Sequence, residues 1–368
     1  MFKLRASYGV VGNQEFSAYQ AKTTFAFNTD RVYNQFITAN LLGYGNPDLK
    51  WQNQYQLNTG LDIGLLEDIL RFQINYYHKK TEGMLTDITV APSLGFNSNT
   101  YTSNLGTIQN DGVELNSNVI LLRDLTRNIE WSVMLQASTN KNKLLKISNA
   151  LKSINAINNA DRTTPLAVYE EGESMSAIKA VKSLGIDPVT GKEIFVKKLT
   201  GAITYDWDAA DKIVCGDSEP LVYGNFGSNL FYKGWNLNLQ FRYRFGADYY
   251  NSTLAQRVEG ANPSLNADRR VLNDRWKKEG QFALYKNIKE YTSTYISTRF
   301  VQKEHLLQLG SLSLSYDFSK KYLEKIKFNS LRASFYMNDI FRISTIKNER
   351  GLSYPFQLSY VFGLNLGF

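Results

Sequence analysis

Three aspartates lie close together in residues 205–211, at positions Asp206, Asp208 and Asp211. Clustered carboxylate oxygens are the ligands that a calcium ion prefers. The spacing lacks the central glycine and the final glutamate of an EF-hand loop, and aspartate is also a common turn residue. We therefore interpret this segment as a solvated turn rather than as a calcium site.

A second acidic group, Glu170, Glu171 and Glu173, could supply paired carboxylates for glycoside hydrolysis. Neighbours in sequence rarely face each other across a substrate, and acidic residues in loops are usually hydrated. The sequence has no glycine-rich phosphate loop and no nucleophile elbow, and its 2 histidines leave no obvious general base. We predict that the protein is not an enzyme.

Metal, redox and nucleic-acid chemistry are also disfavoured. Cys215 is the single cysteine, which excludes an internal disulfide, and His78 and His305 are far apart without cysteine neighbours, so we expect no zinc site and no cofactor. The net charge is +8, but Lys and Arg are interspersed with Asp and Glu and form no basic run with stacking aromatics. We expect no nucleic-acid partner. Since the strand pattern described below predicts a membrane barrel, we assign the surplus charge to solvated loops, to residues of the barrel lumen and to contact with anionic lipid.

The most informative polar residues are Gln240, Arg242 and Arg244, because they alternate with large apolar residues. In residues 235–246 the apolar set is Trp235, Leu237, Leu239, Phe241, Tyr243 and Phe245, and the polar set is Asn236, Asn238, Gln240, Arg242, Arg244 and Gly246. Period two places the two sets on opposite faces of one strand. Since charges facing lipid are costly, we expect the polar face to line a wet lumen, where ion pairing is favoured over a substrate path as the role of the arginines.

Similar alternation recurs along the chain and predicts an all-β protein, an antiparallel transmembrane β-barrel of about ten strands. The predicted strands are 2–9, 52–65, 70–82, 104–122, 127–143, 222–232, 235–247, 305–318, 328–340 and 355–368. Short connections alternate with long ones, as periplasmic turns alternate with extracellular loops in bacterial barrels. No stretch approaches the roughly 18 apolar residues of a membrane-spanning helix.

Aromatic residues flank the short turns. Tyr232 and Trp235 flank the Lys233-Gly234 turn, and Phe318 and Phe328 flank a lysine-rich connection. Amphipathic rings prefer the boundary between membrane and water, so these four residues are predicted to form part of an interface girdle.

Three loop segments carry local signals. Residues 19–27 alternate like a strand of an outer hairpin, and Asp187-Pro188-Val189-Thr190-Gly191 predicts a turn between short strands. Residues 253–291 are expected to be partly helical, with polar faces turned to solvent or to a partner.

Several motifs, in order along the chain, resemble those of the SusC/RagA family of TonB-dependent outer-membrane transporters. They are Leu4-Arg5-Ala6-Ser7-Tyr8-Gly9, Gly12-Asn13-Gln14, Gly45-Asn46-Pro47-Asp48-Leu49-Lys50-Trp51, Tyr76-Tyr77 with Thr81 and Leu85, Leu105-Gly106-Thr107-Ile108-Gln109-Asn110-Asp111-Gly112-Val113-Glu114, Pro220 with Tyr223-Gly224-Asn225-Phe226, Ser297-Thr298-Arg299-Phe300-Val301-Gln302, and Tyr354-Pro355 with Phe368. Two of them have a physical interpretation: Asn46-Pro47-Asp48 should begin a turn, and Asn110-Asp111-Gly112 should form a kink or bulge.

The resemblance implies a cell outer-membrane barrel of about 22 strands with an amino-terminal plug. It implies import of oligosaccharides or peptides, a SusD-like lipoprotein partner, a TonB complex engaged through the amino-terminal part, and contact with lipid and lipopolysaccharide. Residues 1–368 then correspond to the carboxy-terminal part of the barrel, with plug and signal peptide absent. Met1 is expected to be an internal or misplaced start, and the chain alone is not expected to be a competent transporter.

The last strand carries a further signal, typical of outer-membrane proteins in general. Its alternating residues include Tyr360, Phe362 and the final Phe368. Such an ending is similar to the signal that the barrel-assembly machinery reads in outer-membrane proteins.

An alternative hypothesis from the residues is a secreted or surface β-protein that binds glycans through exposed Tyr and Trp. Such a protein would bury its apolar faces inside a sandwich.

Overall fold

Ten long antiparallel strands form one sheet in the computed structural model, which describes residues 1–14, 19–33, 36–43, 45–89, 100–104, 106–262, 264, 268–290, 293–319, 323, 328–347 and 357–367. Their order across the sheet is β1-β4-β5-β8-β9-β15-β16-β17-β18-β19. They are β1 (Phe2–Asn13), β4 (Gln52–Leu65), β5 (Leu70–Glu82), β8 (Gly106–Asp124), β9 (Ile129–Ile147), β15 (Val222–Tyr232), β16 (Trp235–Tyr250), β17 (Val301–Asp317), β18 (Ser330–Ser344) and β19 (Tyr360–Gly367). The predicted all-β fold and all ten predicted strands are confirmed.

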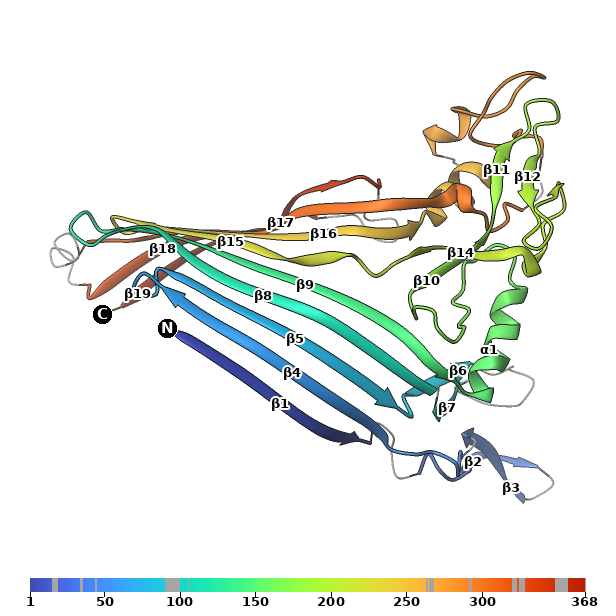
Figure 1. Ribbon diagram of the computed structural model, residues 1–368, viewed down its shortest axis with the longest axis horizontal. Coiled ribbons are helices and arrows are strands. Elements are labelled where there is room, and N and C mark those ends of the chain that lie inside the picture. The colour runs from blue at the N-terminus through green and yellow to red at the C-terminus, as the bar shows by residue number, and fades with distance from the viewer. Residues whose placement is uncertain are drawn as a thin grey trace.

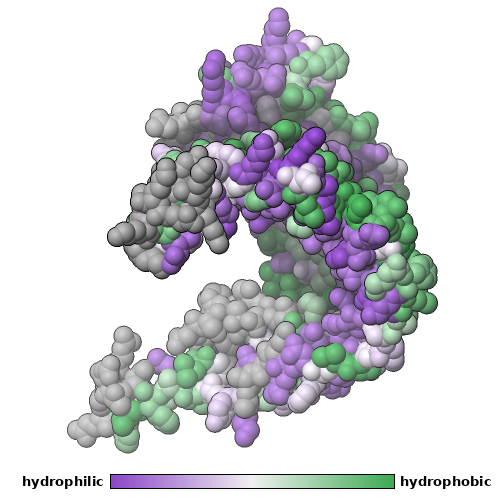
Figure 2. Space-filling view, turned by 90° about the vertical axis from the view of Figure 1, so that its left-hand side faces the viewer, coloured by the Kyte–Doolittle hydropathy of each residue, from purple (hydrophilic) through white to green (hydrophobic). Residues whose placement is uncertain are grey.

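The sheet is an open arc and not a closed cylinder. β1 and β19 are its two edges, and every neighbouring pair between them is antiparallel. In Figure 1 the short turns and both termini lie at one end of the strands, and the long connections lie at the other. Figure 2 shows the arc around a hollow. The predicted alternation of short and long connections therefore corresponds to two ends of the sheet, here called the turn end and the loop end.

The tight turns have backbone conformations that suit their residues. Lys233 and Gly234 have φ of 47° and 93°, and Asn128 has φ of 51°. Two-residue hairpin loops with positive φ at both positions match the twist of the strands they join. These turns fix the register of each hairpin and thus decide which residues share a face.

Each face of the sheet has its own chemistry. One row of directly paired residues crosses nine strands and is polar throughout: Lys3, Asp62, Gln73, Asn116, Gln136, Asn225, Arg242, Gln308 and Arg342. The next row lies on the opposite face and consists of Phe2, Ile63, Phe72, Ser117, Leu135, Phe226, Phe241, Leu309 and Phe341. We call these the polar face and the apolar face.

Smaller elements gather at the loop end. They are the hairpin β2 (Thr24–Tyr33) and β3 (Phe36–Gly43), the hairpin β6 (Leu85–Thr89) and β7 (Thr100–Asn104), helix α1 (Asn149–Ala160), and the short strands β10 (Ala177–Val181), β11 (Ser183–Ile186), β12 (Glu193–Val196), β13 (Ile203–Thr204) and β14 (Lys212–Asp217). Among the described residues, no helix is both long and apolar enough to span a membrane.

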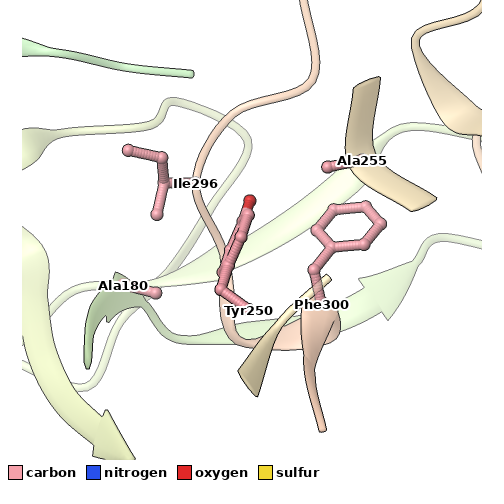
Figure 3. Close-up of a cluster of buried hydrophobic side chains, with 5 residues drawn as sticks. All are labelled: Ala180, Tyr250, Ala255, Ile296 and Phe300. Atoms are coloured by element: carbon pink, nitrogen blue, oxygen red, sulfur yellow. The ribbon is translucent and has the colours of Figure 1, made fainter. Parts of the chain in front are cut away.

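The described residues at the loop end, outside the ten long strands, are here called the loop lobe. A small hydrophobic core joins the loop lobe to the long strands. Ala180, Tyr250, Ala255, Ile296 and Phe300 are buried together, and Figure 3 shows the rings of Tyr250 and Phe300 between Ala180, Ile296 and Ala255. The two rings are in edge contact with centroids 6.0 Å apart. Because Tyr250 ends β16 and Phe300 precedes β17, the core anchors the described residues between these two strands directly on the sheet.

Two loop predictions are confirmed. The alternating residues near 19–27 enter the β2–β3 hairpin, and the turn at 187–191 joins β11 to β12. The carboxylate of Asp187 accepts hydrogen bonds from the Val189 and Thr190 amides and from the Tyr205 hydroxyl. These bonds hold the turn closed.

The partly helical character expected of 253–291 is confirmed in its described residues by a π-helical turn at Leu254–Glu259 and a 3₁₀ turn at Arg269–Leu272. Three details are corrected. Arg275 is buried rather than turned to solvent, with its guanidinium on backbone carbonyls. Gly112 lies in regular β8 without a bulge, where its missing side chain makes room for the ring of Tyr77. The last strand begins at Tyr360 and not at 355, since residues 357–359 are outside it.

Candidate functional site on the polar face

Gln240, Arg242 and Arg244 lie on the polar face of β16, as the alternation predicts. Arg242 pairs with Asn225 on β15 and with Gln308 on β17. Because a charged side chain facing hydrocarbon would cost several kcal/mol, this face is suited to water and not to lipid.

The two arginines differ in their partners. Arg244 has Nη1 3.3 Å from a carboxylate oxygen of Glu304, and its guanidinium also donates to the backbone oxygen of Ser218. Arg342 approaches the other Glu304 oxygen at 3.6 Å. Arg242 is exposed and makes no ion pair within the described part of the chain. Arg244 therefore ties the loop end of the sheet together, whereas Arg242 remains available to solutes.

Arg242 lies in the wall of a cavity of about 540 Å³ near the loop end. Tyr223, Asn225, Gln308 and Glu219 are among the other lining residues. The cavity thus combines the guanidinium groups of Arg242 and Arg244 with two amides, two phenol rings and one carboxylate. Such a surface can form hydrogen bonds with a polar solute, but it does not contain the paired nucleophile and base that bond cleavage would need.

A second cavity, of about 510 Å³, lies on the polar face nearer the turn end. Its wall includes Asp62, Gln73, Asn116, Asn118 and Gln136. Amides thus predominate along the face, and Gln54, Gln56 and Asn58 continue them as a chain of hydrogen bonds along β4. The polar face is therefore a hydrogen-bonding wall with few uncompensated charges.

Glu304, Gln308 and Arg342 are the site residues that the sequence interpretation missed. Glu304 lies just before the predicted start of its strand, and the register of β17 with β18 is shifted next to Gly310. Alternation in 301–309 would have placed Glu304 and Gln308 on one face. The shift explains why Arg342 could not be assigned by counting in twos.

The predicted girdle residues lie at the turn end. Tyr232, Trp235 and Tyr316 form one row of the apolar face, and Trp235 contacts Tyr316 with ring centroids 4.7 Å apart. Phe318 adds an edge contact to Tyr316 at 4.9 Å. Phe328 is half-buried, and its amide donates to the backbone oxygen of Leu323.

The carboxy-terminal strand follows the same division of faces. Tyr360 pairs with Met337 and Phe362 with Phe335, both on the apolar face. Phe362 is 75 % exposed, because β19 is an edge strand. Phe368 lies outside the described residues.

The acidic groups first considered for chemistry have structural contacts. Asp208 caps a 3₁₀ turn through the amide of Ala210, and Asp211 accepts the amide of Lys198. Glu170 and Glu173 both lie 2.7 Å from the buried ammonium of Lys179. Within the described residues, no three metal-binding side chains come together.

Burial makes Cys215 a poor nucleophile. Its thiol is half-buried in the loop lobe and donates to the backbone oxygen of Ile178. Burial raises the pKa of Cys215 to about 11, so the thiolate is scarce at neutral pH.

Long strands with one amide-rich and one apolar face, short turns at one end and long loops at the other define the wall of a β-barrel of the bacterial outer-membrane class. Residues 2–255 match the family model described as TonB dependent receptor-like, beta-barrel. The chain belongs to this family of TonB-dependent receptor barrels.

Individual relatives agree with this assignment. The chain is 27 % identical to TonB-dependent receptor P3 of Formosa agariphila over 90 % of its own length and 34 % of that receptor. It is 21 % identical to the TonB-dependent receptor SusC of Bacteroides thetaiotaomicron, over 100 % of this chain and 37 % of SusC. The chain therefore spans little more than a third of these relatives.

Solved structures show the same fold. The structure of the RagAB peptide transporter matches 94 % of this chain and 38 % of the matched chain, with a TM-score of 0.77 and 20 % identity. The open-open state of the RagAB peptide importer matches 100 % of this chain, also with a TM-score of 0.77. At this identity the likeness concerns the fold alone.

Proposed function

We propose that this chain forms part of the wall of an outer-membrane barrel that imports nutrients with energy delivered through TonB. The observation that carries the proposal is the polar row across nine strands, which is directly flanked by an apolar row on the other face. In this arrangement the apolar face contacts lipid, and the polar face, with Gln240, Arg242 and Arg244, lines the lumen. The wall encloses and guides the solute without chemical change.

The proposed substrates are oligosaccharides or peptides. A wall of amides offers both donors and acceptors, which suits hydroxyl groups and peptide units alike. Peptides are the solutes of the RagAB transporter, whose fold this chain shares. The proposed partners are a SusD-like lipoprotein at the loop end and the TonB complex, engaged through parts of the receptor other than this sheet.

The open edges of β1 and β19 support the need for further strands. Backbone groups that remain unpaired in lipid cost several kcal/mol each. We expect the ten strands alone to be unable to import a solute. Energy-dependent uptake by residues 1–368 in cells that contain no other copy of the receptor would contradict this expectation.

We also propose that β19 is read by the barrel-assembly machinery through Tyr360, Phe362 and Phe368. Aromatic residues on the apolar side of an exposed edge strand support this role. Deleting Phe368 should lower the amount of receptor in the outer membrane. Normal insertion would argue against it.

A secreted glycan-binding sandwich is disfavoured by the exposure of the apolar face. On strands inside the sheet, Ile74, Phe226 and Phe341 are 39 %, 37 % and 41 % exposed, whereas a sandwich would bury such side chains. Lipid contact explains the exposure without a second sheet.

Cysteine labelling in intact cells tests the assignment of the faces. In a Cys215→Ser background, Arg242→Cys should react quickly with a membrane-impermeant maleimide, and its neighbour Phe241→Cys should be protected by lipid. The pair is matched because both positions lie on β16, one residue apart. Equal labelling of both positions in the folded receptor would overturn the proposal.

A further inference from the structure

Lysines lie on the apolar face just beyond its hydrophobic rows, near the loop end. The row Tyr8, Leu57, His78, Asp111 and Lys141 follows the hydrophobic rows on this face. The next row is Val10, Tyr55, Lys80, Gln109 and Lys143. Lys80, Lys141 and Lys143 therefore share one side of the sheet, here called the basic rim.

The carboxylates near the basic rim already have partners. Asp111 accepts hydrogen bonds from Gln109 at 2.6 Å and lies 2.5 Å from Nδ1 of His78. Lys80 lies 2.8 Å from Glu82. Lys141 and Lys143 are exposed and form no ion pair within the described residues. The rim thus has two unpaired ammonium groups directed away from the lumen wall.

A hollow opens beside the rim on the same face. It has a volume of about 400 Å³ and is lined by Tyr8, Tyr55, Leu57, His78, Lys80 and Glu82. Its composition changes from apolar to charged along the strand direction, since Leu57 pairs with His78 and Tyr55 with Lys80. That gradient matches a molecule with an acyl part toward the hydrophobic rows and an anionic part toward the loops.

We propose that the basic rim binds the phosphorylated headgroup of an outer-leaflet lipid, with Lys141 and Lys143 on the phosphate and the hollow holding the proximal acyl and sugar region. The proposal rests on the proposed contact of the apolar face with lipid. Interfacial lysines attract anionic headgroups, and tyrosines favour the same depth. Lys80 adds charge, although part of it is taken by Glu82.

The test uses the full receptor, extracted from the outer membrane in mild detergent, and measures binding of purified lipid A by native mass spectrometry. Each interfacial lysine is expected to strengthen anionic lipid binding about fivefold, so Lys141→Gln with Lys143→Gln should weaken it about thirtyfold. Lys79→Gln is the matched control, because Lys79 is adjacent to Lys80 but lies on the polar face over the Tyr77 ring. Lys141→Arg with Lys143→Arg should retain binding.

Two further probes separate the sources of affinity. Lipid A without its phosphates should bind to the unmodified receptor as weakly as intact lipid A binds to the double glutamine variant. Inorganic phosphate at the same concentration as lipid A should not compete with lipid A for the receptor. Equal binding by the double glutamine variant, equal binding of the dephosphorylated lipid, or full competition by inorganic phosphate would each overturn the proposal. Labelling of Phe241→Cys tests the contact of the apolar face with lipid separately. Rapid labelling would contradict that contact. Protection of Phe241→Cys combined with unchanged lipid A binding by the double glutamine variant would contradict the lipid site alone.

Discussion

Removing the guanidinium of Arg299 should loosen the loop lobe without unfolding the sheet. Arg299 binds two carboxylates at once: Nη2 lies 2.7 Å from Glu193 and Nη1 2.8 Å from Glu259. The side chain of Glu259 is 0 % exposed and that of Glu193 is 8 % exposed. Burial opposes the charge of Arg299, but hydrogen bonds to both carboxylates raise its pKa above the ordinary value. The guanidinium therefore stays charged at every accessible pH.

Arg299→Ala leaves two buried carboxylates without their cation. Breaking a buried ion pair in this way typically costs about 3–5 kcal/mol. The cost should be local, because Glu193 belongs to β12 and Glu259 ends the π-helical turn at 254–259, both within the loop lobe. We expect this variant to keep its barrel and to lose the fixed arrangement of β11, β12 and residues 254–259.

Hydrogen exchange of the receptor in detergent measures the effect. A loss of 3 kcal/mol corresponds to roughly a hundredfold faster exchange of the amides in β11, β12 and residues 254–259, with β4 and β5 unchanged. Arg123→Ala is the matched control, since its pair with Glu130 at 2.9 Å is about half exposed and should contribute at most about 1 kcal/mol. Less than fivefold faster exchange in Arg299→Ala, or an equal effect of Arg123→Ala, would refute the reasoning.

Three further perturbations test the faces, the packing and the loop turn. Phe241→Arg should cost about 2–4 kcal/mol of barrel stability, whereas Gln240→Arg on the other face should cost little; heat-dependent gel mobility compares them, and equal losses would contradict the face assignment. A side chain at Gly112 would meet both the backbone oxygen of Thr139 and the Tyr77 ring, so Gly112→Val should lower heat resistance by roughly 1–3 kcal/mol in the same assay; an unchanged transition would show that the strand can accommodate the side chain. The hydroxyl of Thr190, the Val189 amide and the Tyr205 hydroxyl lower the pKa of Asp187 to about 2 from 3.8, so the turn should be stabilised above pH 3.8 and lose that support as the pH falls toward 2. Asp187→Asn should remove this pH dependence of protease resistance at residues 187–191, and a variant that retains it would disprove the role of the carboxylate.

The sheet could be predicted because each barrel strand has a pattern of alternating apolar and polar residues that is visible in its own sequence. Twelve alternating residues in 235–246 need no tertiary information, and the two-residue turn at Lys233-Gly234 fixes the pairing of β15 with β16. The strand limits are less predictable, since the ends depend on where the neighbouring strand stops. β16 continues to Tyr250 because β17 begins early, at Val301.

The loop lobe was predictable only in fragments. Helix α1 has an N-cap, Ser148, which accepts the amide of Leu151, and its apolar residues Leu151 and Ile154 are three apart, but the helix is short and polar. The contact of Arg299 with Glu193 joins residues 106 positions apart. No local pattern predicts such a contact, because it depends on the burial of both side chains and on the paths of the loops that bring them together.

The candidate site was predictable as a face but not as a set of partners. Alternation places Arg242 and Arg244 together, yet the register pairs Arg244 with Leu306, and only the structure shows that Glu304 is its ion-pair partner. Arg242 has no ion pair among the described residues. The sequence therefore indicates which residues face water. The structure adds that Arg244 is held in an ion pair, whereas Arg242 is exposed.

We expect the selectivity of the proposed importer to depend more on the loop lobe than on the barrel wall. The polar face repeats amides along many rows, and such a surface discriminates poorly between polar solutes. The lobe instead contains a cavity of about 380 Å³ whose lining includes Trp207, Tyr295, Lys286 and Glu193. Because Glu193 both lines this cavity and binds Arg299, the ion-pair network that holds the lobe together also fixes one wall of the cavity. Under the proposed import function, this aromatic and charged cavity would select the solute, and the amide-rich wall would let it pass.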